Sequence, residues 1–223
     1  AMGGTNGDRG YSIALDDSGN VYTTGWFYGT GDFDPGAGAF NLISPGYQAI
    51  FISKLDAEGN FVWAKAMGGI NGAWGSSIAI DASSHIFTTG YFWDIVDFDP
   101  GAGTYNLASA GLQDIFISKL DAAGNFVWAK AMSGPNYEQG RSIAFDASDN
   151  VYTTGSFQGT VDFDPGVGTF NLSSSGTSDI FISKLDTAGN FVWAKAMGGI
   201  SNDGGNSIAL DASGNIFATG TFQ

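Results

Sequence analysis

The sequence predicts an all-β protein assembled from repeated four-stranded units. Segments recur every 65 residues, the apolar runs are short and rich in β-branched and aromatic residues, and glycine-containing turns separate these runs. Glycine accounts for 35 of the 223 residues, yet aromatic residues reach 14%, which indicates sheets with many turns rather than a disordered linker. No segment has a convincing helical period.

The repeat is visible in three motifs that keep the same spacing. "DFDPG" begins at residues 32, 97 and 162, "FISKLD" at 51, 116 and 181, and "GNFVWAKAM" at 59, 124 and 189. All four methionines follow the same step. We therefore divide the chain into three full units and a partial fourth, at 1–65, 66–130, 131–195 and 196–223.

Each unit contains four predicted strands, and the first unit illustrates them. They are "YSIAL" (11–15), "VYTTGWF" (21–27), "AIFISKL" (49–55) and "FVWAKAM" (61–67). Turns of the form D-x-x-G-N join the first strand to the second and the third to the fourth, because Asp caps its own turn and Gly or Asn accepts a positive φ. The long loop at 28–48 joins the two middle strands and holds the DFDPG motif.

Repeated four-stranded antiparallel units are typical of β-propeller blades, which need neighbours to bury both faces. The chain is predicted to form three and a half such blades. A unit of 65 residues exceeds the roughly 40–50 of common blades, and the long loop accounts for the excess. A filament of stacked units is the alternative architecture.

The segments "SIALDASGNIFATG" and "DIFISKLDAAGNFVWAK" resemble the bacterial beta-propeller repeat called SBBP. The glycine pairs at 3–4, 68–69 and 198–199 match the pair that follows the last strand in that family, whereas Ser133-Gly134 departs from it. The resemblance covers nearly the whole chain, except that the DFDPG insertion lies outside the short consensus. It implies a secreted or cell-surface bacterial protein, whose signal peptide is not in this sequence, and it names no substrate.

In a propeller, the loop between the middle strands and the linker to the next unit lie at the same end of the blade, so the DFDPG loops gather there. Asp-Pro-Gly is a strong turn former, and the Asp side chains can bond nearby backbone N–H groups. The alternative is a Ca²⁺ site, because alternating aspartates supply the oxygen ligands that this cation prefers. The full D-x-D-x-D-G pattern is missing. The candidate metal ligands are Asp32, Asp34, Asp97, Asp99, Asp162 and Asp164.

The same end of the units varies between repeats, whereas the strands and hairpin turns hardly change. Aromatic side chains mixed with amides suit a glycan or protein surface, since rings stack and amides bond hydroxyls. The alternative is that these rings pack locally against the long loops. The candidate ligand-binding residues are Trp26, Tyr28, Trp74, Tyr91, Trp93 and Tyr137.

The charge and composition exclude several function classes. A net charge of −14 disfavours nucleic acid as a partner, and no apolar run approaches the ~20 residues that span a membrane. Without cysteine and with His85 as the single histidine, a nucleophilic triad or a zinc site is not expected. Asp8, Glu138 and Asp203 share one linker position where the second unit has Ala73, a variation that predicts a solvated loop.

We therefore expect no enzyme and no catalytic residues, but a structural, adhesion or protein-binding module. A lectin-like glycan binder assisted by calcium is the second hypothesis, and a carbohydrate-active enzyme is the third. Three and a half blades do not close a ring of roughly four to eight. Either self-association or the remainder of a longer repeat array is thus the expected partner.

Overall fold

A computed structural model describes residues 2–223. It contains strands and no helix in that range, and therefore no helix that could cross a membrane. The four long strands of each repeat pair antiparallel in chain order. In the first repeat they are β2 (Asp8–Leu15), β3 (Val21–Phe27), β6 (Ala49–Leu55) and β7 (Phe61–Gly69). The second repeat contains β8 (Ala73–Ile80), β9 (Ile86–Phe92), β12 (Asp114–Leu120) and β13 (Phe126–Met132). The third contains β14 (Gln139–Phe145), β15 (Val151–Phe157), β18 (Asp179–Leu185) and β19 (Phe191–Met197), and a hairpin of β20 (Gly204–Leu210) and β21 (Ile216–Thr221) follows.

The predicted all-β propeller-type fold is confirmed, with two differences in detail. The first strand starts at Asp8 rather than at residue 11, because the linker continues into it. The long loop also contains short strands that the sequence pattern does not reveal. They are β4 (Thr30–Asp32) and β5 (Asn41–Ile43), β10 (Ile95–Asp97) and β11 (Asn106–Ala108), and β16 (Thr160–Asp162) and β17 (Asn171–Ser173). The division of the chain into units at the predicted residue numbers stays a prediction.

The D-x-x-G-N turns form as their side chains predict. Asp16 accepts hydrogen bonds through Oδ1 from the backbone N–H groups of Ser18 and Asn20, both at 3.0 Å. Gly19 has a φ of 79°, a conformation that favours glycine. The same bonds recur in the other hairpins, so each turn is held by the aspartate at its start.

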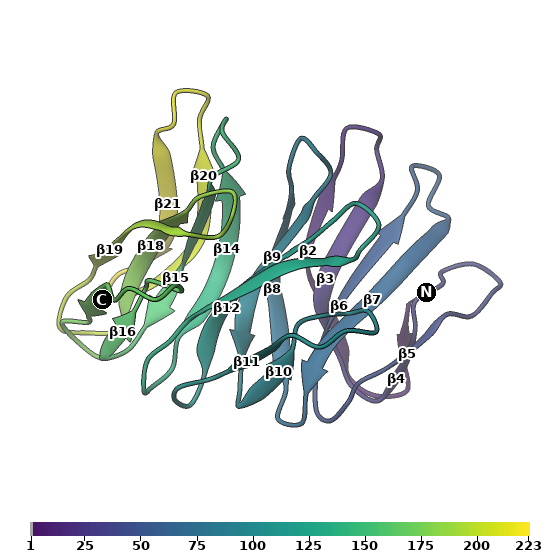
Figure 1. The fold of residues 1–223 in the computed structure, drawn as a ribbon, viewed down its shortest axis with the longest axis horizontal. Coiled ribbons are helices and arrows are strands. Elements are labelled where there is room, and N and C mark those ends of the chain that lie inside the picture. Colours follow the sequence, from purple (N-terminus) through teal and green to yellow (C-terminus); the bar gives the residue numbers. More distant parts are fainter. Residues whose placement is uncertain (1) are drawn as a thin grey trace.

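The sheets stand side by side, with the first strand of each repeat next to the first strand of the following one (Figure 1). The Ser12 hydroxyl accepts a hydrogen bond from the backbone N–H of Ile78 at 3.2 Å, and the pairs Ser77–Ile143 and Ser142–Ile208 repeat it. A Cβ atom on Gly75 would lie 2.4 Å from Thr24 Oγ1, so glycine is needed where the sheets approach. Large apolar side chains fill the space between neighbouring sheets.

The faces that are buried between neighbouring sheets are exposed at the two outer sheets. Ile13 is 64% exposed, whereas its equivalent Ile78 in the second repeat is 4% exposed. Phe217 is 59% exposed, whereas its equivalent Phe87 is fully buried. Each outer sheet therefore exposes apolar side chains that are buried at the equivalent positions between sheets.

The linkers and the short strands of the long loops lie at one end of the sheets, which we call the loop end. The tip of each long loop runs along the outer strand, so that Phe40 packs on Phe61 beside a hairpin turn with ring centroids 4.8 Å apart. Strand β1 (Gly3–Gly4) pairs with β4, and Gly68–Gly69 in β7 pairs with β10. In the third repeat Ser133 forms the corresponding bridge to Asp162. The hairpin turns lie at the opposite end, which we call the turn end (Figure 1).

Candidate functional site

The phenylalanine of each DFDPG motif anchors the long loop in the core. Phe98 is fully buried, with ring centroids 5.5 Å from Phe92 and 4.9 Å from Phe116. Phe33 and Phe163 occupy the same place in the other repeats. The motif therefore recurs because every long loop needs this anchor.

The aspartates around that phenylalanine hold the loop backbone. Asp32 accepts through Oδ1 from the N–H groups of Asp34 (3.0 Å) and Phe40 (2.8 Å), and Asp34 accepts from Gly36 at 2.7 Å. The Phe40 bond in particular holds the pKa of Asp32 below its usual value. The equivalent bonds of Asp97, Asp99, Asp162 and Asp164 repeat the pattern.

The bonds to the DFDPG aspartates are those of a turn, and Ca²⁺ binding by the same carboxylates stays a prediction. Across residues 2–223, no group of three or more His, Cys, Asp or Glu side chains gathers as a metal site would.

Four of the six predicted ligand-binding aromatics pack against one another. The Trp26 ring stacks on Trp74 at 5.4 Å with an interplanar angle of 23°, and Tyr91 and Trp93 contact Trp74 at 5.3 and 5.9 Å. Trp26 is only 9% exposed, and burial raises the pKa of Tyr91. These contacts are the local packing that was the alternative to ligand binding for these aromatic residues. A ligand-binding role for the same residues stays a prediction.

The remaining two predicted aromatics are exposed at the loop end. Tyr28 is 40% exposed and stacks on Tyr47 at 6.1 Å, and Tyr137 is 46% exposed. Tyr47, which is 60% exposed, donates its backbone N–H to the carbonyl of Ile70, itself 74% exposed. We call Tyr28, Tyr47 and Ile70 the loop-end patch.

The sequence does not single out Tyr47, because it lies within the long loop rather than in a recurring strand or linker motif. Its equivalents are Leu112 and Thr177, and this variation between otherwise similar repeats was the available signal. Leu112 is 51% exposed, so the second repeat also presents an apolar side chain at this position.

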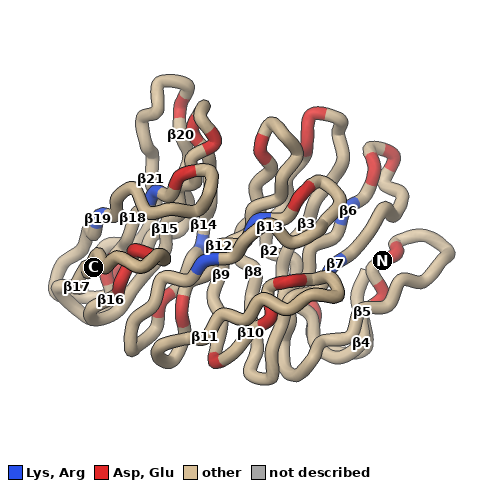
Figure 2. The backbone as a smooth tube through the Cα atoms, in the orientation of Figure 1, with Lys and Arg blue, Asp and Glu red and all other residues tan. Residues whose placement is uncertain are grey.

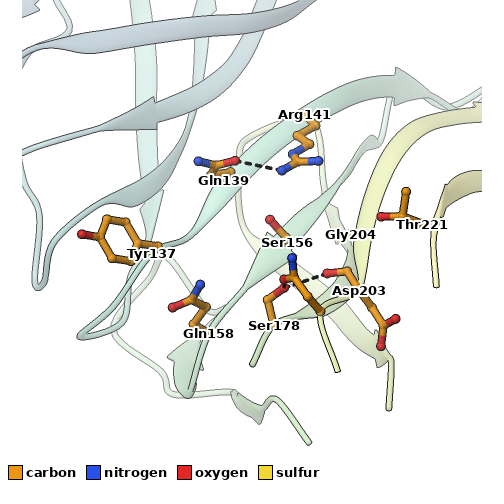
Figure 3. Close-up of a pocket in the computed structure, with 10 residues that line it drawn as sticks. Tyr137, Gln139, Arg141, Ser156, Gln158, Ser178, Asp203, Gly204 and Thr221 are labelled. Carbon is orange, nitrogen blue, oxygen red and sulfur yellow. Dashed lines mark hydrogen bonds between the residues drawn. The ribbon is translucent and has the colours of Figure 1, made fainter. Parts of the chain in front are cut away.

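A polar cavity of about 310 Å³ lies between the third repeat and the β20–β21 hairpin. Gln139 and Arg141 lie on one side of the close-up view and Gln158 and Ser178 on the other, with Ser156 between them (Figure 3). Arg141 donates to Gln139 Oε1 at 3.1 Å. No local sequence pattern indicates this cavity, because the cavity forms only where two sheets meet.

Two buried carboxyl groups face each other between the second and third repeats. Asp114 and Glu138 are both fully buried, and within residues 2–223 neither carboxylate oxygen of Glu138 has a hydrogen-bond partner. Burial, together with the neighbouring Asp114, raises the pKa of Glu138 to about 9. The equivalent contact between the first and second repeats holds Ala49 and Ala73, which are also fully buried.

The prediction that this linker position is a solvated loop is therefore wrong for Glu138 and for Asp203, which is 2% exposed. The reason is that the linker backbone pairs with the preceding repeat: Glu138 donates its N–H to Gln113 O at 2.9 Å, and Asp203 donates to Ser178 O at 2.8 Å.

Acidic residues also mark the tips of the hairpin turns (Figure 2). Asp56 accepts from the side chain of Asn60 at 2.9 Å, and this bond holds the pKa of Asp56 below its usual value. In the second repeat His85 replaces the asparagine of the turn, and its Nδ1 lies 2.8 Å from Asp81. The histidine therefore takes the structural place of the asparagine, as its position in the turn suggested.

Comparison with known proteins gives one family and two relatives. A "WD repeat-containing protein" of Acanthamoeba polyphaga mimivirus, L264, which is itself uncharacterized, is 24% identical over 227 aligned residues, covering 90% of this chain and 16% of the relative. The "Regulatory protein FlaEY" of Caulobacter vibrioides is 26% identical over 110 residues, covering 49% of this chain and 12% of the relative. The chain thus spans less than a fifth of either relative.

Residues 2–33 match the model of the SBBP family, which is described as a beta-propeller repeat. The matched segment holds the first linker, β2, β3 and the start of the DFDPG loop, and all of these recur in the following repeats. This match confirms the predicted resemblance to the SBBP repeat over residues 2–33.

Proposed function

We propose that this chain is a non-catalytic, protein-binding β-propeller module of a secreted or cell-surface bacterial protein, with a structural or adhesive role. The observation that carries the proposal is the loop-end patch, where Tyr28 and Tyr47 stack while both remain exposed. Tyrosine is enriched at protein interfaces, because its ring buries a large apolar area while its hydroxyl keeps a hydrogen-bond partner.

The backbone beneath the patch is fixed before any partner binds. Besides the bond from Tyr47 to Ile70, Ala73 donates its N–H to the carbonyl of Gln48 at 2.9 Å. These bonds join the long loop of the first repeat to the linker of the second. A surface that is already ordered loses less conformational entropy on binding, which favours affinity.

The two relatives add support of a general kind. One is named for WD repeats and the other for regulation, and both names are compatible with protein contacts. Secretion or surface display follows only from the resemblance to the SBBP repeat. The exposed faces of the outer sheets favour a further blade as a second partner, from the same array or from another copy of the chain.

The lectin-like alternative uses the same aromatic residues, with Tyr28 and Tyr137 as the exposed rings among them. Calcium at the DFDPG loops would add oxygen ligation to that alternative. Both are tested by glycan binding with and without EDTA, using the variant Tyr28→Gln, which copies Gln158 of the third repeat.

Site-specific photo-crosslinking tests the proposed protein binding. A photoreactive amino acid replaces Tyr47 in one sample and Glu58, which lies in a turn-end hairpin, in another, and each is exposed to proteins secreted by the source organism. We expect a discrete protein adduct from position 47 that Tyr28→Gln weakens, and none from position 58. Equal labelling from both positions, or no adduct from position 47, would contradict the proposal.

A further inference from the structure

The polar cavity beside β14 and β20 has the size and lining of a small-ligand site. Its volume of about 310 Å³ lies at the lower end of the roughly 300–1,000 Å³ that ligand pockets occupy. A space of this size holds several water molecules, or one small polar molecule in their place.

The cavity exists because side chains that fill the equivalent space elsewhere are small here. Between the first and second repeats, Trp26, Trp74 and Tyr91 form one stack. Between the third repeat and the β20–β21 hairpin, the equivalent positions hold the small residues Ser156, Gly204 and Thr221. The two positions on the second side pair across the hairpin in the same way in both places, Trp74 with Tyr91 and Gly204 with Thr221, so the loss of three rings leaves an open space.

The lining offers both hydrogen-bond donors and acceptors that remain available. Among residues 2–223, the side-chain amide of Gln158 has no hydrogen-bond partner, and only its backbone carbonyl accepts a bond. The guanidinium of Arg141 donates to Gln139 and Asn206, which orients it and leaves further N–H groups for a ligand. Tyr137 lies at one end of the cavity (Figure 3).

The charges in the lining disfavour an ionic ligand. Of the described residues that line the cavity, Arg141 is the one cationic residue and Asp203 the one acidic residue. Asp203 is buried, and its two carboxylate oxygens already accept from the backbone N–H groups of Gly199 and Gln223 at 2.7 and 2.8 Å. A phosphate would meet a single cation in a chain with a net charge of −14, and the amine of an amino acid would find no free carboxylate.

We propose that this cavity binds a neutral saccharide unit. Hydroxyl groups of a pyranose both donate and accept, which matches the amides of Gln139 and Gln158, the hydroxyl of Ser156 and the free N–H groups of Arg141. The site is separate from the loop-end patch, so it can be occupied whether or not that patch binds a protein.

The test is a titration of ¹⁵N-labelled protein with glucose, galactose, N-acetylglucosamine, maltose and cellobiose, followed by NMR. We expect saturable shifts at Gln139, Gln158 and Arg141 with at least one of them, and a Kd of about 1 mM or tighter. Glucose 6-phosphate serves as the charged probe, and it is expected to bind more weakly than glucose.

Variants copied from the other repeats sharpen the test. Ser156→Trp reproduces Trp26 and fills the cavity, so it is expected to abolish the shifts, while Gln158→Ala weakens binding about two- to tenfold. Thr177→Tyr, which reproduces Tyr47 outside the cavity, is the matched control and leaves binding unchanged.

Two results would overturn the proposal. One is the absence of shifts at the cavity with every sugar, and the other is shifts confined to Tyr28 and Tyr47. If Ser156→Trp fails to fold, which circular dichroism reveals, the comparison of Gln158→Ala with Thr177→Tyr decides the outcome.

Discussion

The turn end and the loop end of the sheets belong to the same repeats, but their residues vary between repeats to different degrees. At the turn end, Asp56, Asp121 and Asp186 make the same bonds to the asparagine four residues later. At the loop end, Tyr28 is replaced by Trp93 and then by Gln158. At the turn end, each hairpin turn is held by hydrogen bonds within that turn. At the loop end, backbone hydrogen bonds connect each long loop to the linker of the next repeat, and the exposed side chains differ from one repeat to the next.

This difference separates residues that fold the unit from residues available for binding. Within the loop end itself, the DFDPG phenylalanine and its aspartates are constant because they anchor the loop, whereas the positions above them vary. A variable side chain on a fixed backbone is where specificity can change without loss of the fold. The predictions below test that separation, in order of decreasing effect on stability.

Removing the loop anchor is expected to have the largest effect. Phe98→Ala deletes a fully buried ring between Phe92 and Phe116, and such changes cost about 3–5 kcal/mol. Urea denaturation, with hydrogen exchange to locate the loss, measures it. Tyr105→Ala, at a partly exposed ring in the same loop, is the control. Equal losses in both variants would show that the phenylalanine is not the anchor.

The buried Glu138 is expected to make stability depend on pH. Its pKa is about 9 in the folded protein and near 4.5 when unfolded, so the folded state holds the extra proton between these values. Stability should therefore fall as the pH rises from about 4.5 to about 9. Glu138→Gln stays neutral and should flatten this slope, with a gain of about 1–3 kcal/mol near pH 8.

Denaturation curves at pH 5 and pH 8 measure the effect of Glu138→Gln. Glu58→Gln, at an exposed turn, should leave the slope of the wild type unchanged. An unchanged slope in Glu138→Gln would mean that Glu138 is ionised in the folded protein.

A single turn aspartate is expected to matter less. Asp186 accepts from the N–H groups of Ala188 and Asn190 and from the Asn190 side chain, so Asp186→Ala should cost about 1 kcal/mol. Burial opposes ionisation, but the Asn190 bonds outweigh it and lower the pKa of Asp186. The stabilisation is therefore present above pH 3.8 and is lost as the pH falls through the lower folded value.

Hydrogen exchange of the β18–β19 hairpin at pH 6 and pH 3 checks the prediction for Asp186. The difference between wild type and Asp186→Ala should shrink at the lower pH. A difference that grows on acidification would show that the carboxylate does not hold the turn.

The loop-end patch is expected to contribute least to stability. The double variant Tyr28→Gln and Tyr47→Thr copies the residues of the third repeat, Gln158 and Thr177. Because both rings are exposed, we expect a change of about 0.5 kcal/mol or less in the free energy of unfolding. A thermal melt measures it, and a loss comparable with that of Phe98→Ala would place the pair in the core.

Sequence periodicity was sufficient to predict the strands, the hairpin turns and the common position of the DFDPG loops, because these depend on local pattern and on repetition. The contact between Asp114 and Glu138 joins two repeats through backbone pairing, so no local pattern indicates it. The cavity was equally hidden, since it depends on Ser156 and Gly204 facing each other across two sheets. The change from Tyr47 to Leu112 and Thr177 between repeats was a sequence signal that could have indicated an exposed position.

The most direct test of the account is the affinity for the protein that crosslinks to position 47, measured with three forms of the chain. The wild type is compared with Tyr28→Gln/Tyr47→Thr at the loop end and with Glu58→Ala at the turn end, which copies Ala123 of the second repeat. We predict that Kd rises at least about tenfold for the loop-end variant, a loss of roughly 1.4 kcal/mol, and stays unchanged for the turn-end variant. An unchanged Kd for the loop-end variant, or a rise for the turn-end variant alone, would contradict the assignment of binding to the loop end.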